Sequence, residues 1–331
     1  MYDSDYLDQV NDSVSILDYA TACGFVFQQR GKRNWTNCPL HEDKTPSLMV
    51  DDQNRFHCFS CGIHGGIINW ISSIENIPFM DAVDKASRIG HIDPSKMCRS
   101  ETLLFNRRIY RKKNIHEEPH IILPESRWEA FPSCHPQIWI DEGISETVMD
   151  YFDIRMDNAS SRIVYPVRLD GGELIGIKGR TTVDYKALDV PKYMNYYPIT
   201  TVDFLQSLDK TLPFVKKSGE VILFEGIKSC MKAATWGIWN TAAVESHVIN
   251  RHQVRLLVRL GVNITVAFDS DVSYSSEETL RSSLDTLKRF TNVYVVEDPD
   301  GILGGAKAKN APVDLGKDIW VKLYKERRRW T

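Results

Sequence analysis

The sequence predicts a multidomain protein of the α+β and α/β classes, and three observations carry this prediction. Three cysteines and a histidine crowd into residues 38–61, in the spacing of a small metal-bound ribbon. Two strands joined by the turn Asp170-Gly171-Gly172 predict a mixed α+β region in the middle of the chain. From residue 219 onward, apolar strands alternate with helical segments, which is the pattern of a mostly parallel, Rossmann-like sheet.

Length and composition restrict the class of protein. With 331 residues, 42% hydrophobic and 26% charged, the chain has room for two or three globular domains. A net charge of −3 neither requires nor excludes a nucleic-acid partner. No secretory signal and no apolar run of about 18 residues is present, so we expect no membrane partner. The other four cysteines are scattered singly, which favours a reducing cytoplasm over a disulfide-stapled secreted fold: Cys23, Cys98, Cys134 and Cys230.

The first motif reads C-x2-H, sixteen intervening residues, then C-x2-C. Two close pairs separated by a hairpin-sized insert are typical of a closed tetrahedral zinc site. Four ligands leave no open position, so the pattern predicts one structural Zn²⁺ rather than a catalytic ion. The alternative is a set of reduced core cysteines. The predicted ligands are Cys38, His41, Cys58 and Cys61.

The insert supplies the strands that bring these pairs together. Residues 46–50 and 55–59 have strand-like composition, residues 51–54 read as the turn between them, and 67–76 has helical apolar spacing. His57 and His64 also lie nearby, but the paired spacing favours His41, so we interpret these two histidines as surface or supporting residues.

The segments "CPLHEDKTPSLMV" and "FHCFSCGIHGGIINWI" resemble the zinc-binding domain of bacterial DnaG-type DNA primases. In that family the ribbon binds single-stranded template and helps to choose the initiation site. Aromatic faces can stack on bases while cations contact phosphates, although both phenylalanines could instead pack the small core. The candidates for template contact are Arg33, Trp35, Lys44, Arg55, Phe56 and Phe59.

A basic stretch follows the ribbon. Between residues 99 and 113, six Lys or Arg residues stand against the single acid Glu101. Such a block can track a phosphate backbone or be a solvated tether, and in either case it indicates a boundary. The predicted organisation is a zinc ribbon (1–96), a basic linker (97–125), an N-terminal subdomain of the primase core (126–215) and a catalytic domain (216–331).

The pieces "RIVYPVR", "GELIGIKGR" and "PKYMN" also resemble the DnaG-type primases, in the region that precedes the metal site. There the family carries a basic surface along which template and nascent duplex run. The alternative for each cation is an exposed charge that protects a strand edge. The resemblance implies template, primer or nucleotide contacts for Arg162, Lys178, Arg180, Lys192, Tyr193 and Asn195.

Carboxylates follow two strands of the predicted parallel sheet. Glu225 ends the apolar segment 219–225, and Asp269 and Asp271 end the segment that starts at residue 262. Carboxyl ends of parallel strands meet at one edge, where three acids would repel one another without a cation. Mg²⁺ takes oxygen ligands and supports in-line phosphoryl transfer. A lone Asp-x-Asp is more often a helix cap or turn, whereas Glu-Gly combined with Asp-x-Asp is far more selective.

That combination resembles the Toprim domain of primases, topoisomerases and some nucleases. The resemblance implies Glu225, Asp269 and Asp271 as ligands of Mg²⁺ or Mn²⁺, with Lys228 added to the catalytic set. The last acidic element departs from the family. Asp318 matches its first acid and Trp320 stands where the second is expected, so Asp314 is the candidate substitute and the second metal is in question.

A ribbon, a basic strand region and a Toprim domain, in that order, predict a DNA primase that makes short RNA primers from ribonucleoside triphosphates on single-stranded DNA. Two alternatives remain: a single-stranded-DNA-binding accessory protein with weak or no synthesis, and a Toprim nuclease. A topoisomerase would need a tyrosine domain and a much longer chain.

The end of the sequence carries two further expectations. Full-length bacterial primases continue into a helicase-interacting domain, so an end at "KERRRWT" predicts a phage or mobile-element version, helicase contact through another surface, or a boundary of the sequence. Arg327-Arg328-Arg329 reads as the solvated end of a helix, with DNA binding as the alternative.

Overall fold

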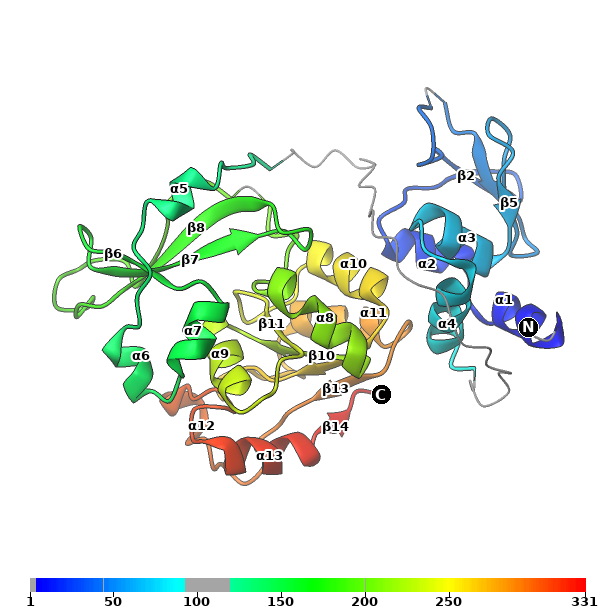
Figure 1. Cartoon of the computed structure of the whole chain (residues 1–331). Coiled ribbons are helices and arrows are strands. Elements are labelled where there is room, and N and C mark those ends of the chain that lie inside the picture. The colour runs from blue at the N-terminus through cyan, green and yellow to red at the C-terminus, as the bar shows by residue number, and fades with distance from the viewer. Residues whose placement is uncertain (1–3, 44, 93–119, 200) are drawn as a thin grey trace. The chain divides into compact units, whose positions relative to one another are not determined.

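A computed structural model describes residues 4–43, 45–92, 120–199 and 201–331. These residues form two compact units, the first built mainly from the chain before residue 117 and the second from the chain after it (Figure 1). The predicted basic linker, 97–125, lies outside the described residues up to position 119. Within the described ranges, no helix combines the length and apolarity that a membrane span requires.

The first unit contains a five-stranded antiparallel sheet and four helices. The strands follow chain order across the sheet, and they are β1 (Gln28–Arg30), β2 (Arg33–Thr36), β3 (Leu48–Val50), β4 (Phe56–Cys58) and β5 (His64–Gly65). The helices are α1 (Ser4–Ser13), α2 (Ile16–Ala22), α3 (Ile67–Ile74) and α4 (Phe79–Ile89). The predicted hairpin of the zinc ribbon is confirmed as β3–β4, and the predicted helix after it as α3.

The β3–β4 turn is stabilised by local polar contacts. The Asp51 carboxylate accepts hydrogen bonds from the backbone N–H groups of Gln53 and Arg55. Asn54 adopts a left-handed conformation (φ 59°) that asparagine tolerates well. Its amide group donates to the carbonyls of Asn11 and Val14, so the hairpin is held to the last turn of α1 and to the residue that follows this helix.

The second unit begins with an antiparallel sheet whose strands also follow chain order: β6 (Arg155–Asp157), β7 (Arg162–Arg168), β8 (Leu174–Thr181) and β9 (Tyr193–Asn195). Three short helices precede it: α5 (Ser126–Glu129), α6 (Gln137–Asp141) and α7 (Glu146–Tyr151). The predicted turn at residues 170–172 is confirmed as the β7–β8 connection. Gly172 has a φ of 94° there, a conformation that costs a glycine little.

The remaining sheet has the order β11-β10-β12-β13-β14, and its first four strands are parallel. They are β10 (Glu220–Phe224), β11 (Thr241–Ala243), β12 (Asn263–Val266) and β13 (Val293–Val295), joined by α9 (Ile227–Thr235), α10 (Arg251–Leu260) and α11 (Glu278–Leu287). The α/β prediction is therefore confirmed. α8 (Leu208–Ser218) and α9 pack on β10 and β11 (Figure 1).

The C-terminal basic run differs from its predicted helical form. Beyond α12 (Gly305–Ala308), α13 spans Lys317–Lys325 and ends before the arginines. Arg328 and Arg329 form the short strand β14, which pairs antiparallel with β13. The prediction of a solvated helix end was wrong because an open edge of the sheet offers this segment backbone partners that the helix end lacks.

One apolar core runs through both predicted parts of the second unit. Buried side chains of β7, such as Ile163 and Tyr165, cluster with Ile222 and Phe224 of β10. The predicted boundary at residue 215 falls inside α8. Antiparallel and parallel sheets thus meet in a shared core, which positions side chains of one relative to the other.

Candidate active site and zinc centre

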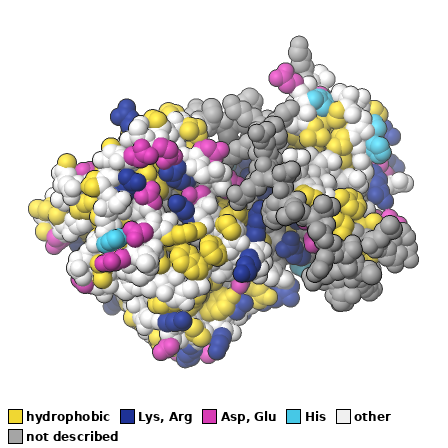
Figure 2. Space-filling view, in the orientation of Figure 1, with side chains coloured by type: hydrophobic (Ala, Val, Ile, Leu, Met, Phe, Trp, Pro, Cys, Tyr) yellow, Lys and Arg dark blue, Asp and Glu magenta, His cyan; other side chains and the backbone are white. Residues whose placement is uncertain are grey.

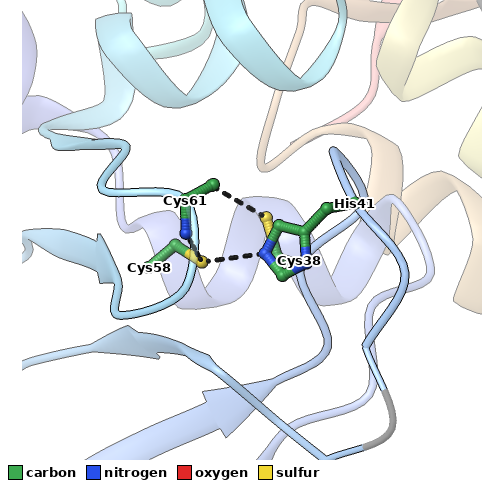
Figure 3. Close-up of side chains that lie close together, drawn as sticks. All are labelled: Cys38, His41, Cys58 and Cys61. Carbon is green, nitrogen blue, oxygen red and sulfur yellow. Dashed lines mark hydrogen bonds between the residues drawn. The ribbon is translucent and has the colours of Figure 1, made fainter.

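The four predicted zinc ligands converge in the first unit. All of their donor atoms lie within 4.8 Å of one another, and Figure 3 shows the side chains pointing toward a common centre. Cys38 Sγ is 3.8 Å from Cys61 Sγ, and His41 Nε2 is 3.2 Å from Cys58 Sγ. Tetrahedral zinc with Zn–S bonds of about 2.3 Å separates two sulfurs by about 3.8 Å, so the donor set fits Zn²⁺.

Local structure holds each pair of ligands in place. The Cys58–Cys61 turn is closed by a hydrogen bond from the Gly62 N–H to the Cys58 carbonyl, and the Cys61 N–H points at Cys58 Sγ. Asp43 supports the other pair. Its carboxylate lies 3.2 Å from His41 Nδ1 and accepts a hydrogen bond from the Cys38 N–H at 2.8 Å. This contact leaves His41 Nε2 directed at the cysteines.

The thiol environment also suits a metal site. Burial raises the pKa of the Cys58 thiol, but hydrogen bonds involving Ser47, the Cys61 N–H and His41 outweigh it and bring the pKa to about 6. Burial raises the pKa of Cys38 to about 12. A divalent cation is what allows such buried thiols to ionise together.

One face of the ribbon sheet carries an aromatic row, formed by the rings of Trp35, His57, Phe59 and His64. Directly paired strand residues share a face, and the pairs Trp35–Met49, Met49–His57 and His57–His64 run across four strands. Phe59 extends the row, since its ring stacks on Trp35 with centroids 5.5 Å apart and is 60% exposed. Such a face can receive stacked bases.

The structure separates the other predicted template residues. Phe56 is only 1% exposed and packs edge-on against Trp70, so its assignment to template was wrong and its alternative, core packing, is correct. The residue lies on the opposite face of β4 from His57 because side chains alternate along a strand. Arg33 and Arg55 are exposed, whereas Lys44 lies outside the described residues.

The three predicted magnesium ligands lie together at the carboxyl edge of the parallel sheet. Glu225 directly follows β10 and Asp269 follows β12 by three residues. Carboxylate oxygens of Glu225, Asp269 and Asp271 lie within 4.8 Å of one another, and the Asp269 N–H donates to Glu225 Oε1 at 2.9 Å. Oxygens on opposite sides of Mg²⁺ are about 4.2 Å apart, so small side-chain adjustments fit this ion.

Electrostatics at this edge favour a bound cation. Burial, followed by the charges of Glu225, Asp314 and Asp271, raises the pKa of Asp269 to about 7. Burial also raises the pKa of Glu225, and Asp271 adds to that shift. Both shifts reflect the unfavourable free energy of ionising neighbouring carboxyl groups in a partly buried place, which a divalent ion offsets.

The other predicted acids lie outside this three-acid cluster. Asp314 is ion-paired with Lys232, with 2.6 Å between Oδ1 and Nζ, and it accepts a hydrogen bond from the Ala311 N–H. Asp318 is exposed on the first turn of α13. Trp320 is buried and packs on Phe224 of β10, with centroids 5.5 Å apart. The roles of Asp314 and Asp318 as metal ligands stay predictions.

Lys228 belongs to a network of ion pairs beside the acids. It pairs with Glu142, whose carboxylate also lies 3.7 Å from Lys232 Nζ. Burial lowers the pKa of Lys228, the Glu142 carboxylate opposes that shift, and the nearby Arg180 adds to it. Glu142, at the end of α6, therefore serves as a shared counter-ion for two lysines of α9.

Four of the predicted basic-region residues share one face of the antiparallel sheet. Lys178 pairs across β8–β9 with Asn195, and Arg180 with Tyr193. Lys192 acts on the pKa of Asp269, and Asp269 acts on that of Tyr193, so this face is electrostatically coupled to the carboxylates. The ammonium of Lys178 is 5.4 Å and that of Lys192 5.6 Å from the Tyr193 ring centroid.

Two residues of this region have environments that the sequence did not predict. Arg162 is 6% exposed, on the opposite face from Arg180, and it donates to the Pro191 carbonyl at 2.9 Å. Its assignment to direct nucleic-acid contact was wrong, because β7 is an inner strand covered on both faces. Lys178 is ion-paired with Glu245, a partly buried carboxylate that follows β11.

Charge is mixed over the face of the second unit that Figure 2 shows. On the face shown in Figure 2, Lys and Arg side chains of the second unit are interspersed with acidic and hydrophobic ones. A cavity of 290 Å³ beside the basic face is lined by Ile138, Arg180, Thr181, Thr182, Val183, Asp184, Tyr185 and Lys192. The lining of this cavity therefore carries two cations, Arg180 and Lys192, and one acid, Asp184.

Sequence reasoning missed the residues that support the predicted ones. Asp43 had a local signal, because it stands two residues after a metal-ligating histidine. Glu142 and Glu245 had none, since each meets its lysine only through tertiary structure, across 86 and 67 positions respectively. Lys309, which pairs with Asp271 at 2.6 Å, likewise had no signal.

Comparisons with known proteins agree with this architecture. The family model of the CHC2 zinc finger, the DnaG-type zinc ribbon, matches residues 2–101. A DNA primase of Staphylococcus epidermidis is 26% identical over 347 residues, covering 91% of this chain and 57% of that protein. A DNA primase of Staphylococcus aureus strain MSSA476 is 24% identical over 348 residues, covering 91% of this chain and 56% of that protein.

Among solved structures, the zinc-binding and RNA polymerase domains of the Aquifex aeolicus primase are 19% identical, with a TM-score of 0.49 and coverage of 98% of this chain and 86% of that one. The chain spans less than two thirds of the length of the two staphylococcal primases. Residues 2–101 match the family model of the DnaG-type zinc ribbon, and the chain is similar in sequence to DNA primases over nine tenths of its length.

Proposed function

We propose that the protein is a DNA primase that makes short RNA primers on single-stranded DNA from ribonucleoside triphosphates. The observation that carries this proposal is the meeting of Glu225, Asp269 and Asp271 at one sheet edge, beside a basic face from a second sheet. Carboxylates that bind a divalent ion, next to cations that bind phosphates, are the parts that nucleotidyl transfer requires.

Each part of the chain has a distinct task in this proposal. Mg²⁺ or Mn²⁺, when bound, neutralises phosphate charge and activates the attacking hydroxyl. The three acids hold and orient the ion. Arg180 and Lys192 bind phosphates of the nucleotide, template or primer. Tyr193 and Asn195 lie beside them on β9. Two further lysines are held nearby by ion pairs, Lys178 with Glu245 and Lys228 with Glu142. Positioning and charge neutralisation supply most of the rate enhancement for this chemistry.

The zinc ribbon is assigned to the template. Trp35 and Phe59 offer stacked, accessible rings, and Arg33 lies two residues before Trp35 on the same face of β2. Base stacking on aromatic rings is tolerant of sequence, while the cation meets the backbone. One Zn²⁺ maintains this face and takes no part in the reaction, because all four of its ligands come from the protein.

The proposal extends to the organisation and setting of the protein. We assign the ribbon to residues 1–96, the linker to 97–125, the N-terminal subdomain to 126–215 and the catalytic domain to 216–331. A primase works beside the replicative helicase in the cytoplasm of a bacterium or a phage-infected host, so helicase is the proposed protein partner.

Primer synthesis by the purified protein tests the proposal. Labelled ribonucleotides, a single-stranded DNA template and either Mg²⁺ or Mn²⁺ are the reactants, and Glu225→Gln and Asp269→Asn are the test variants. Glu278→Gln is the matched control, since it makes the same carboxyl-to-amide change on an exposed residue of α11. We expect short RNA products from the wild type and the control, and a loss of at least 100-fold, on the order expected when an essential charge is removed, in both test variants.

A second candidate is a single-stranded-DNA-binding accessory protein. The observation that favours it is the buried Trp320 at the place predicted for an acid, together with the position of Asp314 and Asp318 outside the cluster. Binding of single-stranded DNA without synthesis in either metal would support this candidate. In a parallel reaction with an end-labelled template, metal-dependent shortening of that template would instead indicate a Toprim nuclease.

A further inference from the structure

A glycine-rich loop lies directly against the Asp-x-Asp segment. Residues 301–310 lie between β13 and α13, include the short helix α12, and contain Gly301, Gly304 and Gly305, all with positive φ. The Ser270 N–H donates to the Asn310 carbonyl at 3.0 Å, and the Ser270 hydroxyl donates to the Gly305 carbonyl at 3.0 Å. The loop is therefore fastened at two points to the residue between Asp269 and Asp271.

This arrangement places a lysine at the carboxylate cluster. Lys309 Nζ lies 2.6 Å from Asp271 Oδ2, while the side chain as a whole remains 70% exposed. Its backbone has a φ of 52°, the left-handed conformation that commonly ends a helix, and Lys309 directly follows α12. Lys307, two residues earlier, makes no ion pair within the described part of the chain and is exposed.

We propose that Lys309 binds the terminal phosphates of the nucleoside triphosphate at this site, and that its pairing with Asp271 is the resting contact it leaves to do so. The inference rests on the proposed function and deepens it. A lysine ammonium is a compact cation with three donors on a flexible stem, which suits a phosphate oxygen. An exposed lysine–carboxylate pair is weak, so a triphosphate competes for the ammonium effectively.

The position of Asp271 indicates which phosphates Lys309 reaches. Asp271 is the exposed member of the cluster, whereas Glu225 and Asp269 are partly buried. A divalent ion held by Glu225, Asp269 and Asp271 would neutralise phosphate charge, so the phosphates of a bound nucleotide would lie next to these carboxylates. The reacting phosphate would lie at the partly buried Glu225 and Asp269. Lys309, on the solvent side of Asp271, would then contact the terminal phosphates, which project outward.

Nucleotide binding tests this inference without requiring synthesis. Mg²⁺ with ATP, AMP or inorganic pyrophosphate is titrated into wild type, Lys309→Met, Lys309→Arg and Lys307→Met, and the dissociation constants are measured by calorimetry. We expect Lys309→Met to weaken ATP and pyrophosphate binding about 10-fold, to leave AMP binding unchanged, and to be rescued in part by Lys309→Arg. Lys307→Met, the matched control, should bind all three like the wild type.

Other outcomes overturn the inference. Equal ATP affinity in Lys309→Met and Lys307→Met would exclude Lys309 as a phosphate ligand. Tighter Mn²⁺ binding by Lys309→Met with unchanged ATP affinity would limit Lys309 to being a counter-ion of Asp271. A wild type that binds ATP through Lys309 but makes no primer would sustain this inference while removing the proposed function. Unchanged melting temperatures establish that the variants fold.

Discussion

Two phenylalanines three positions apart in the zinc ribbon lie in opposite environments. Phe56 fills the small core against Trp70, while Phe59 stacks on Trp35 at the surface. Both rings are apolar and both precede or follow a zinc ligand by one or two positions. Their environments differ because one lies within β4 with its side chain facing inward and the other lies in the turn that follows.

These two positions give a matched pair of variants. Phe59→Ala should weaken single-stranded DNA binding by about 1–3 kcal/mol, the usual contribution of one stacked base, with little change in melting temperature. Phe56→Ala should destabilise the first unit by about 3–5 kcal/mol because it leaves a cavity in the core. Fluorescence anisotropy with a labelled oligonucleotide and thermal unfolding measure the two effects. Wild-type affinity in Phe59→Ala would contradict the role assigned to the aromatic row.

Glu142 supports a second prediction at the scale of a residue. Its carboxylate opposes the burial that lowers the pKa of Lys228. Glu142→Gln removes the negative charge that raises the pKa of Lys228, so this pKa should fall further. Lys228 should therefore lose its proton at a lower pH than in the wild type. Primer synthesis by this variant should therefore decline earlier on the alkaline side than that of the wild type, and Glu142→Asp should restore part of the range. Superimposable pH–rate profiles would show that Glu142 acts only through folding.

At the scale of an element, α13 shows why an acid is absent from its expected position. Trp320 and Leu323 on the inner side of this helix are buried, and Trp320 contacts both Phe224 of β10 and Tyr324. The Trp320 ring packs on the parallel sheet. The family resemblance leads us to expect a carboxylate at this position. At this position the chain uses the side chain for packing rather than for metal binding.

Trp320→Asp tests this explanation. The substitution removes a large buried ring and introduces a carboxylate without a cation partner, so it should destabilise the second unit by at least about 3–5 kcal/mol. Trp320→Phe, which keeps an aromatic ring, should lose much less. Urea denaturation followed by circular dichroism measures both. A Trp320→Asp variant as stable as the wild type, with increased affinity for Mn²⁺, would show that the position remains part of the metal site.

At the scale of the whole molecule, zinc and the carboxylates belong to different compact units. Cys38, His41, Cys58 and Cys61 all lie in the first unit, and Glu225, Asp269 and Asp271 all lie in the second. The ribbon strands are only two to four residues long, so their stability depends strongly on the metal that joins their turns. The second unit has an extensive apolar core of its own.

Removal of zinc should therefore affect one unit only. When a chelator is present, the first unit should unfold at a lower temperature than it does with zinc. The unfolding temperature of the second unit should be the same with and without zinc. Tyrosine and tryptophan fluorescence together with calorimetry follow the two events, and a stoichiometric addition of Zn²⁺ is the control that should restore the first. A single transition that shifts as a whole on chelation would refute this independence.

The sequence by itself determined the features that depend on spacing and periodicity. The C-x2-H and C-x2-C pairs predicted the four-donor cluster, because ligands on two tight turns joined by one hairpin have little freedom. Alternating strands and helices predicted the parallel sheet. Because ligands bind at the carboxyl edge of such a sheet, the sequence also predicted that Glu225, Asp269 and Asp271 lie close together, as they do in the structure.

Only the tertiary structure decided which side chains face solvent and which cations meet which acids. Burial distinguished Phe56 from Phe59 and Arg162 from Arg180, and the free edge of β13 turned a predicted helix end into β14. The pairings Lys228–Glu142, Lys178–Glu245 and Lys309–Asp271 join segments 38 to 86 positions apart. No local pattern encodes such contacts, because they depend on how separate elements pack around a shared core.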